Sequence, residues 1–435
     1  MSLLRALDKQ PLVQKQTFEY DRWTKPQLIN RIRELEGSPD TGGEIVENVT
    51  KEQKEEDNNT IKKKKKPREF DFSKYPKRFI ALKFAYLGWN YNGLSFQQEV
   101  TSLPTVEEEI LKALAKSRLI REPEPASCDL SRCGRTDKGV SAMNQVISLQ
   151  VRSTLTEEEL DDPANDHKEL PYVTILNSLL PCDIRVTGVS LRPPPGFNAR
   201  FSCTYRHYKY FFKNWGHLDI DKMRQAVCKY EGLHDFRNFC KLDGSKQINN
   251  YERNIYEAQI NHWKDDFYVL DLKGTAFLWH QVRYMMAILF LVGQKLESPS
   301  IVADLLEPEK YPAKPQFEMA SEVPLVLFDC GFEGLEWLTP LDFPNLHSKL
   351  IRDNTTVRAL LLDYQLKAHV AGLMQEVAEH HLSHLALGSS ESGIIEVGDG
   401  RGRNYKSYLS IDKRPVNDCF QIINERFRHK KRRCH

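Results

Sequence analysis

The stretch Gly134-Arg135-Thr136-Asp137-Lys138-Gly139-Val140-Ser141-Ala142 combines two glycines with a run of charged residues. Glycine lets a backbone turn tightly or approach a ligand closely. Asp137 stands between Arg135 and Lys138, whose positive charges favour the ionised carboxyl group. An ionised carboxylate in a loop is a candidate nucleophile or general base. The alternative is a surface turn with ordinary ion pairs. The loop offers no obvious second acid, so Asp137 would act alone.

The segments on both sides of this loop show strand and helix patterns. Residues 145–151 alternate between apolar and polar, as in a half-buried strand. Thr105 followed by Glu108 predicts a capping box that starts a helix. Further strands are predicted at 79–86, 184–189, 204–212, 255–260, 267–272 and 325–332, and further helices at about 219–230 and 277–292. Strands and helices mix without strict βαβ alternation, which favours an α+β fold with a largely antiparallel sheet.

The nine quoted residues resemble the signature of the tRNA pseudouridine synthases of the TruA family. Residues 197–210 resemble the second motif of that family, and residues 276–277 with 280–283 resemble the third, in the same order. The resemblance implies the pseudouridine synthase fold. In this fold two related lobes share a mixed, mainly antiparallel sheet, and a basic cleft lies at its centre.

The resemblance also implies a reaction. Uridine is isomerised: its N-glycosidic bond is cut, the uracil is turned, and a carbon–carbon bond joins it to the same ribose. Asp137 matches the essential aspartate of the family. It would attack the ribose, add to the uracil ring, or remove a sugar proton. The sequence does not show which of these three steps it performs. The reaction requires neither a cofactor nor a metal.

A stacked uridine must leave its helix to reach a loop carboxylate, at a cost of roughly a few kcal/mol. Tyr208 matches the family's tyrosine, whose ring would stack on the extruded base for ~1–3 kcal/mol; the alternative is a core aromatic residue. Arg135 would fill the vacated stack or pair with Asp137. Arg283, in an apolar helix, is expected to meet a carboxylate, with Asp137 as the candidate; the alternative is that it reaches the surface. Candidate RNA-binding residues are Lys138, Arg206, His207 and Lys209.

Residues 232–241 look most like the eukaryotic branch that modifies tRNA positions 38 and 39. Two alternatives stay open: a sister synthase for another tRNA site, such as positions 27 and 28, and a non-catalytic RNA-binding or chaperone protein of the same fold. The resemblance further implies a homodimer that holds one tRNA.

The chain is predicted to have three parts. Residues 1–77 form an N-terminal extension, with a short helix at 24–36 and a disordered linker at 38–68. Residues 78–337 form the catalytic domain, with lobes of about 78–190 and 191–337. Residues 338–435 form a helical extension with a basic tail. A helix at about 354–387 is expected to pack an apolar stripe against the main domain.

The composition of this 435-residue chain bears on its cellular compartment, and its formal net charge is only +2. Two segments are strongly basic: lysines 62–66 and residues 426–433. Such runs are solvated tails, or they attract nucleic acid or act as a nuclear import signal. We expect the protein in nucleus and cytoplasm. Nine scattered cysteines favour a reducing compartment. No secretory signal is visible, and the most apolar stretch is shorter than the ~20 residues of a membrane span. The histidines near 380 lack the pattern of a metal site.

Overall fold

The computed structural model describes residues 70–342, 347–383 and 393–433. The predicted helix at 24–36 and linker at 38–68 lie outside these residues, as does most of the predicted N-terminal extension.

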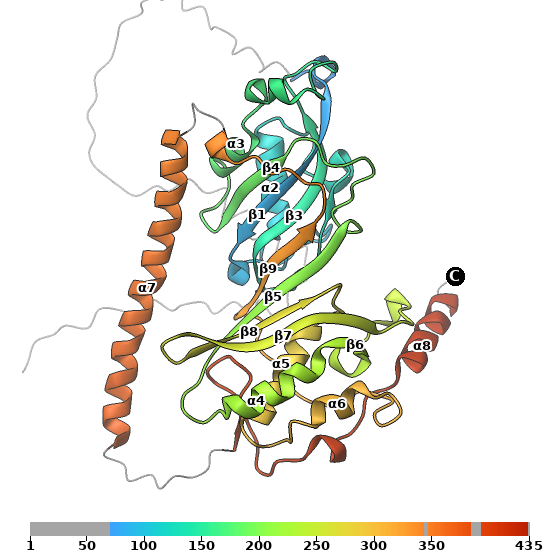
Figure 1. Cartoon of the computed structure of the whole chain (residues 1–435), viewed down its shortest axis with the longest axis vertical. Coiled ribbons are helices and arrows are strands. Elements are labelled where there is room, and N and C mark those ends of the chain that lie inside the picture. Colours follow the sequence, from blue (N-terminus) through green and yellow to red (C-terminus); the bar gives the residue numbers. More distant parts are fainter. Residues whose placement is uncertain (1–69, 343–346, 384–392, 434–435) are drawn as a thin grey trace, which may run out of the picture. The chain divides into compact units, whose positions relative to one another are not determined.

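One nine-stranded sheet organises the described chain (Figure 1). Its strands are β1 (Lys77–Tyr86), β2 (Ser131–Arg132), β3 (Ser141–Arg152), β4 (Ile184–Ser190), β5 (Cys203–Lys213), β6 (Gly232–Asp235), β7 (Glu252–Lys264), β8 (Phe267–Gly274) and β9 (Leu325–Phe332). The order is β4-β1-β3-β9-β5-β8-β7-β6, and β2 pairs with β3. Only β3 and β9 run parallel among these strand pairs. The predicted α+β class and mainly antiparallel sheet are therefore confirmed.

Helices accompany both halves of the sheet. They are α2 (Val106–Lys116), α3 (Tyr172–Asn177), α4 (Ile220–Val227), α5 (Gln281–Gly293), α6 (Ile301–Leu306), α7 (His347–Ser383) and α8 (Phe420–Arg433); a two-stranded hairpin, β10 (Ile394–Ile395) with β11 (Arg403–Asn404), completes the regular structure. The capping box of α2 is confirmed, with Thr105 and Glu108 each accepting from the other's backbone N–H. Asp219 caps α4, and a 3₁₀ turn (Cys228–Tyr230) continues it to the predicted residue 230.

The buried helix α5 begins later than predicted. His280 has a φ of 63°, in the left-handed region, so a right-handed helix begins only at Gln281. The predicted start at 277 was wrong, and residues 277–280 form a loop instead. From Gln281 onward all but one of the thirteen residues are buried. No helix within the described ranges is long and apolar enough to cross a membrane.

Two apolar cores lie along the sheet. One gathers side chains of β1, α2, β3, α3 and β4, and the other gathers those of β5, α4, β7, β8, α5 and α6. Leu191, Phe197 and Ala199 follow β4 in sequence but pack into the first core. The first core therefore extends past residue 190, while the predicted lobe boundaries stay a prediction.

The C-terminal residues 393–433 pack on the second core. Ile411 is buried within it, and the ring of Phe420 at the start of α8 packs in a tilted arrangement on Tyr251, with a centroid distance of 5.0 Å. The Tyr408 hydroxyl donates to Glu297 at 2.6 Å. These contacts make this segment part of the folded domain.

The long helix α7 does not bury its apolar stripe, so the expected packing against the main domain was wrong for most of that stripe. Five predicted members have 57–79% of their surface exposed: Leu361, Val370, Leu373, Met374 and Val377. Tyr364 does make a contact, edge-on to Trp89 at 5.1 Å. The helix begins at residue 347 instead of 354 and continues to residue 383, the last one described before a gap, so the predicted end at 387 lies outside the described residues.

Candidate active site

The loop that carries Asp137 is fixed by backbone contacts with the segment after β1. The amide of Leu94 donates to the Thr136 carbonyl at 3.2 Å, and the Thr136 hydroxyl bonds the buried Tyr86 hydroxyl at 2.7 Å. Glycines permit this approach: a Cβ on Gly88 would lie 2.0 Å from the Val140 carbonyl oxygen. The loop therefore holds Asp137 in a defined place.

The Asp137 carboxylate meets two side chains from the loop before α5. The Trp279 indole Nε1 donates to its Oδ1 at 3.1 Å, and His280 Nε2 lies 3.4 Å from its Oδ2. The side chain of Asp137 is 34% exposed. The carboxylate is thus held by the indole on one oxygen and flanked by the imidazole on the other, while it stays reachable from the cavity described below.

The electrostatics of Asp137 differ from the sequence expectation. Burial raises its pKa, and it outweighs the Trp279 hydrogen bond and the charges of Arg283 and Lys241, which lower it. The expectation that Arg135 and Lys138 would favour the ionised form was wrong, because both side chains are exposed and neither is among the main influences on this pKa. A carboxylate with a raised pKa is a stronger base and nucleophile than an ordinary one.

His280 stays neutral at neutral pH. Burial lowers its pKa to about 4, and the charges of Arg283, Lys241 and Lys314 act in the same direction. Its Nδ1 is buried without a hydrogen-bond partner among the described residues. The imidazole beside Asp137 is therefore a neutral dipole that adds no full positive charge.

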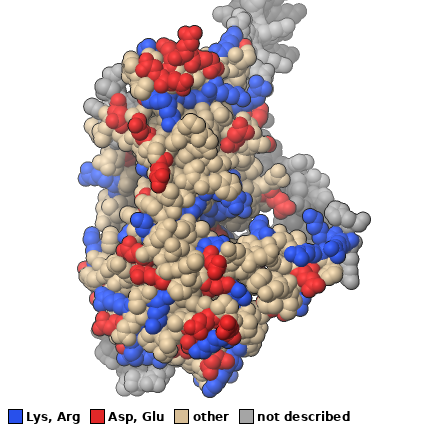
Figure 2. Space-filling view, turned by 45° about the vertical axis from the view of Figure 1, so that its right-hand side comes forward, with Lys and Arg blue, Asp and Glu red and all other residues tan. Residues whose placement is uncertain are grey.

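A cavity of about 1190 Å³ opens around Asp137. Its lining includes seven cationic side chains, Arg132, Arg135, Lys138, Arg200, Lys241, Lys246 and Arg283, and three acidic ones, Asp129, Asp137 and Asp243. Figure 2 shows Lys and Arg side chains inside a hollow near the middle of the face drawn. Positive charge thus dominates the cavity, as the resemblance implied.

Tyr208, on β5, lines the same cavity. Its ring packs edge-on against Phe277 at a centroid distance of 5.0 Å. Burial raises the pKa of its hydroxyl. Trp279, whose ring lies under the Lys241 ammonium at 4.5 Å, adds a second aromatic surface. Together these rings offer flat apolar surfaces to a base near the carboxylate.

Arg283 meets a carboxylate as expected, but not that of Asp137. Its guanidinium donates to Glu322 at 2.7 Å and to the Ala320 carbonyl at 2.7 Å. Glu322 also packs on the loop, because a Cβ on Gly139 would lie 2.7 Å from its Cγ. The pairing with Asp137 is therefore corrected to Glu322, and Arg283 acts on Asp137 only through its charge.

The other predicted residues fall into two groups. Arg135 and Lys138 are exposed at the cavity, and no ion pair joins Arg135 to Asp137 in the described structure. The remaining three predicted residues, Arg206, His207 and Lys209, do not line the cavity. Arg206 donates to the carbonyls of Cys133, Thr275 and Arg200. His207 and Lys209 lie on the opposite face of β5 from Tyr208, and both bond Asp271. RNA binding by these residues stays a prediction.

Four residues of the site were not predicted from the sequence: Trp279, His280, Lys241 and Glu322. His280 and Lys241 lie within blocks that resemble the family and Trp279 lies between the two parts of the third block, so their positions were visible but their contacts were not. Glu322 lies 39 residues after Arg283, and only the fold brings the two together. The cavity contains no group of three metal-ligating side chains among the residues described.

A held carboxylate in a basic cavity lined with rings defines an enzyme that acts on a nucleic-acid base. A family model described as tRNA pseudouridine synthase matches residues 226–333. The "tRNA pseudouridine(38/39) synthase" of Saccharomyces cerevisiae is 50% identical over 426 residues, which cover 97% of this chain and 94% of the yeast protein. The human protein of the same description is 38% identical over 87% of this chain and 80% of its own length. The chain belongs to the tRNA pseudouridine synthase family and is an isomerase.

Proposed function

We propose that this chain converts uridine to pseudouridine at positions 38 and 39 of the tRNA anticodon arm. The observation that carries the proposal is the Asp137 carboxylate, held at 3.1 Å by Trp279 inside a cavity that also presents Tyr208. The relatives named for positions 38 and 39 support the choice of site. The reaction rearranges bonds within one nucleotide, so no electron or group leaves the substrate.

The cavity suits an extruded nucleotide with part of its RNA strand. Its volume exceeds the ~300–1,000 Å³ of ordinary small-molecule pockets. Rings at Tyr208 and Trp279 offer stacking surfaces, and cations at the rim attract phosphates. Because Asp137 has a raised pKa, it is strengthened for each of the three first steps considered above, whether it attacks carbon or removes a proton.

Replacing Asp137 tests the catalytic role. Asp137→Asn keeps the shape of the side chain and removes the carboxylate, so tRNA binding should persist while pseudouridine formation falls by at least ~10²–10⁴-fold. Asp129→Asn is the matched control, because Asp129 also lines the cavity but is not in the loop. Each variant is expressed in cells that lack the native gene, and pseudouridine is mapped along their tRNA.

The mapped positions separate the alternatives. Loss of pseudouridine at 38 and 39 alone supports the proposal. Loss at 27 and 28 instead would identify a sister synthase. An unchanged pseudouridine content with Asp137→Asn would identify a non-catalytic RNA-binding protein.

The proposed RNA surface continues onto α8. Asn424 donates to the Ile248 carbonyl at 3.1 Å, and Arg428 donates to Gln247 at 2.5 Å. Lys246 and Ile248 line the cavity, so these bonds hold the basic helix at its rim. We infer that the exposed cations of α8 contact tRNA phosphates outside the anticodon loop.

The proposed homodimer uses α7. Leu366, Val370, Leu373 and Val377 follow the alternating spacing of four and three residues that is typical of paired helices, and all are at least 57% exposed. The occupant we propose is the same helix of a second copy, because an identical stripe supplies the matching surface. The presence of the protein in both nucleus and cytoplasm is proposed from its basic runs alone.

A further inference from the structure

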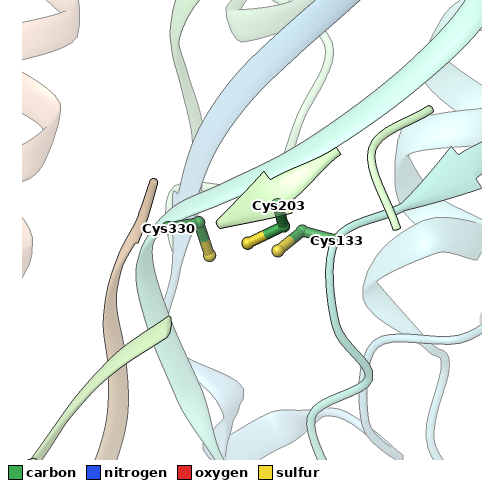
Figure 3. A group of neighbouring side chains, drawn as sticks. All are labelled: Cys133, Cys203 and Cys330. Carbon is green, nitrogen blue, oxygen red and sulfur yellow. The ribbon is translucent and has the colours of Figure 1, made fainter. Parts of the chain in front are cut away.

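Three cysteines gather where the two halves of the sheet meet. Cys133 lies just before the loop of Asp137, Cys203 begins β5, and Cys330 is on β9. Their sulfur atoms all lie within 4.8 Å of one another. Figure 3 shows the three side chains converging from three separate segments. Within the described ranges no other group of three or more metal-ligating side chains comes this close.

The size of this cluster fits a metal ion. Sulfur ligands bind Zn²⁺ at ~2.3 Å, which places three of them about 4 Å apart around one ion. The present spacing of at most 4.8 Å would need to close by less than about 1 Å. Thiolate sulfur is the ligand that Cu⁺ and Zn²⁺ prefer among protein side chains.

A positive charge lies beside the cluster. The Arg206 guanidinium is fixed beside the cluster by its bond of 2.9 Å to the Cys133 carbonyl. A fixed cation offsets the negative charge that three thiolates around one metal ion would leave.

The cluster borders the active-site cavity, because Cys133 is among the residues that line it. By comparison, the buried Cys128 lies in the first core, and its thiol donates to the backbone carbonyls of Glu124 and Pro125. Cys133, Cys203 and Cys330 therefore combine mutual proximity, a neighbouring cation and a position beside the cavity.

We propose that Cys133, Cys203 and Cys330 form a binding site for one soft, thiophilic metal ion, Zn²⁺ or Cu⁺. Binding replaces the thiol protons, which pass to solvent, and transfers no electrons. The ion would tie the loop of Asp137 to β5, which carries Tyr208, and to β9. Because this role is structural, the site stands independently of the proposed function.

Cadmium titration of the full chain tests this site. The purified, reduced and chelator-treated protein is titrated with Cd²⁺, and the thiolate-to-cadmium absorption band and melting temperature are recorded. We expect the band to saturate at one ion per chain with a rise in Tm. Cys203→Ser should abolish both changes, and the matched control Cys128→Ser should keep both. If Cys203→Ser does not fold, Cys330→Ala replaces it, with circular dichroism as the check on folding.

Competition then identifies the ion. Zn²⁺ and Cu⁺ are added separately to the cadmium-loaded protein, and the one that removes the band at the lower free concentration is the preferred ion. The proposal is overturned if wild-type protein gives no band, if the band survives in a folded cluster variant, or if neither ion displaces cadmium.

Discussion

The Trp279 indole donates a hydrogen bond to Oδ1 of Asp137 at 3.1 Å, across 142 residues of sequence. A donor of this kind stabilises the charged carboxylate, whereas burial of the same group opposes it. The pKa of Asp137 is the outcome of these two effects and of the charges of Arg283, Lys241 and Glu322. Residues outside the family signature therefore adjust the basicity of the reacting group.

Removing the indole donor should shift the pH profile. Asp137 works in its ionised form, so activity is lost as pH falls through its pKa, which is raised above the ordinary 3.8. Trp279→Phe keeps a ring but loses the hydrogen bond, and the pKa rises further. We expect the acid limb of the pH profile of the single-turnover rate to move to higher pH. Trp215→Phe, at an exposed tryptophan away from the cavity, should leave that limb in place. An unmoved limb in Trp279→Phe would contradict this account.

Glu322→Gln should shift the same limb in the opposite direction. The negative charge of Glu322 raises the pKa of Asp137, so its removal lowers that pKa and the acid limb moves to lower pH. Arg283 loses its ion pair, but Glu322 is partly exposed, so stability should fall only on the order of 1 kcal/mol. Glu318→Gln makes the same charge change at an exposed position. Equal profiles for the two variants would show that proximity to Asp137 plays no part.

The sequence predicted the longer strands of the sheet, because their apolar alternation reflects local geometry, but it did not predict the short strands β2 and β6. It placed Asp137 in a loop between strands for the same reason. It failed where the outcome depends on distant residues. The sign of the pKa shift of Asp137 was wrong because burial, which raises the pKa, outweighs the nearby positive charges, and the charges that lower it come from the distant Arg283 and Lys241. The start of α5 was missed because His280 adopts a left-handed conformation that histidine rarely shows.

Two other differences have physical causes of the same kind. The three clustered cysteines, Cys133, Cys203 and Cys330, are 70 and 127 residues apart in the sequence. No short spacing pattern therefore predicts their cluster. The stripe on α7 was assigned to the main domain because burial within one chain is the simplest use of apolar residues. The exposed side chain of Leu373, at 62%, shows that this face has no cover within the described part of the chain.

Asp271 should stabilise the fold in a pH-dependent way. Burial would raise its pKa, but hydrogen bonds from His207, Lys209 and Asn261 outweigh it and lower the pKa to about 2. A lowered pKa contributes stability above the unfolded value of 3.8, and this contribution is lost as pH falls toward 2. Asp271→Asn should therefore lower the free energy of unfolding by on the order of 2 kcal/mol at pH 7, and by much less near pH 2.

Urea denaturation at several pH values measures this effect. Asp221→Asn is the control, since that side chain is 83% exposed and should change stability little at any pH. A loss of stability in Asp271→Asn that does not depend on pH would show that packing, and not ionisation, is responsible.

Charges on the α7 stripe should separate the proposed dimer. Leu366→Lys with Leu373→Lys places two ammonium groups in the proposed interface. It also removes two leucine side chains, each of which would stabilise the dimer by about 1.5–3 kcal/mol when buried. The mass measured by light scattering should fall from that of two 50.5-kDa chains to that of one. Ala371→Lys with Gln375→Lys charges the same helix outside the stripe and should leave the dimer intact. A wild-type protein of single-chain mass at micromolar concentration would refute this assignment of α7.

Neutralising the cations of α8 should weaken tRNA binding in a salt-dependent way. Lys430, Lys431 and Arg432 are exposed on a helix that Asn424 anchors beside the cavity. Each phosphate contact releases counterions and adds about 0.7–0.9 to the slope of log K against log salt. Serine at all three positions should therefore reduce that slope by up to about 2–3, with weaker binding at low salt.

The control must match the change in net charge. Lys116, Lys229 and Lys264 are exposed and lie outside the cavity lining, so serine at these three positions removes equal charge from scattered sites. Long-range attraction alone would lower binding similarly in both triple variants, whereas direct phosphate contacts lower the slope only in the α8 variant. Because Asp137 and its neighbours are untouched, the single-turnover rate at saturating enzyme should stay unchanged, which separates a loss of affinity from a loss of chemistry. Equal slopes in the two variants would place the tRNA away from α8.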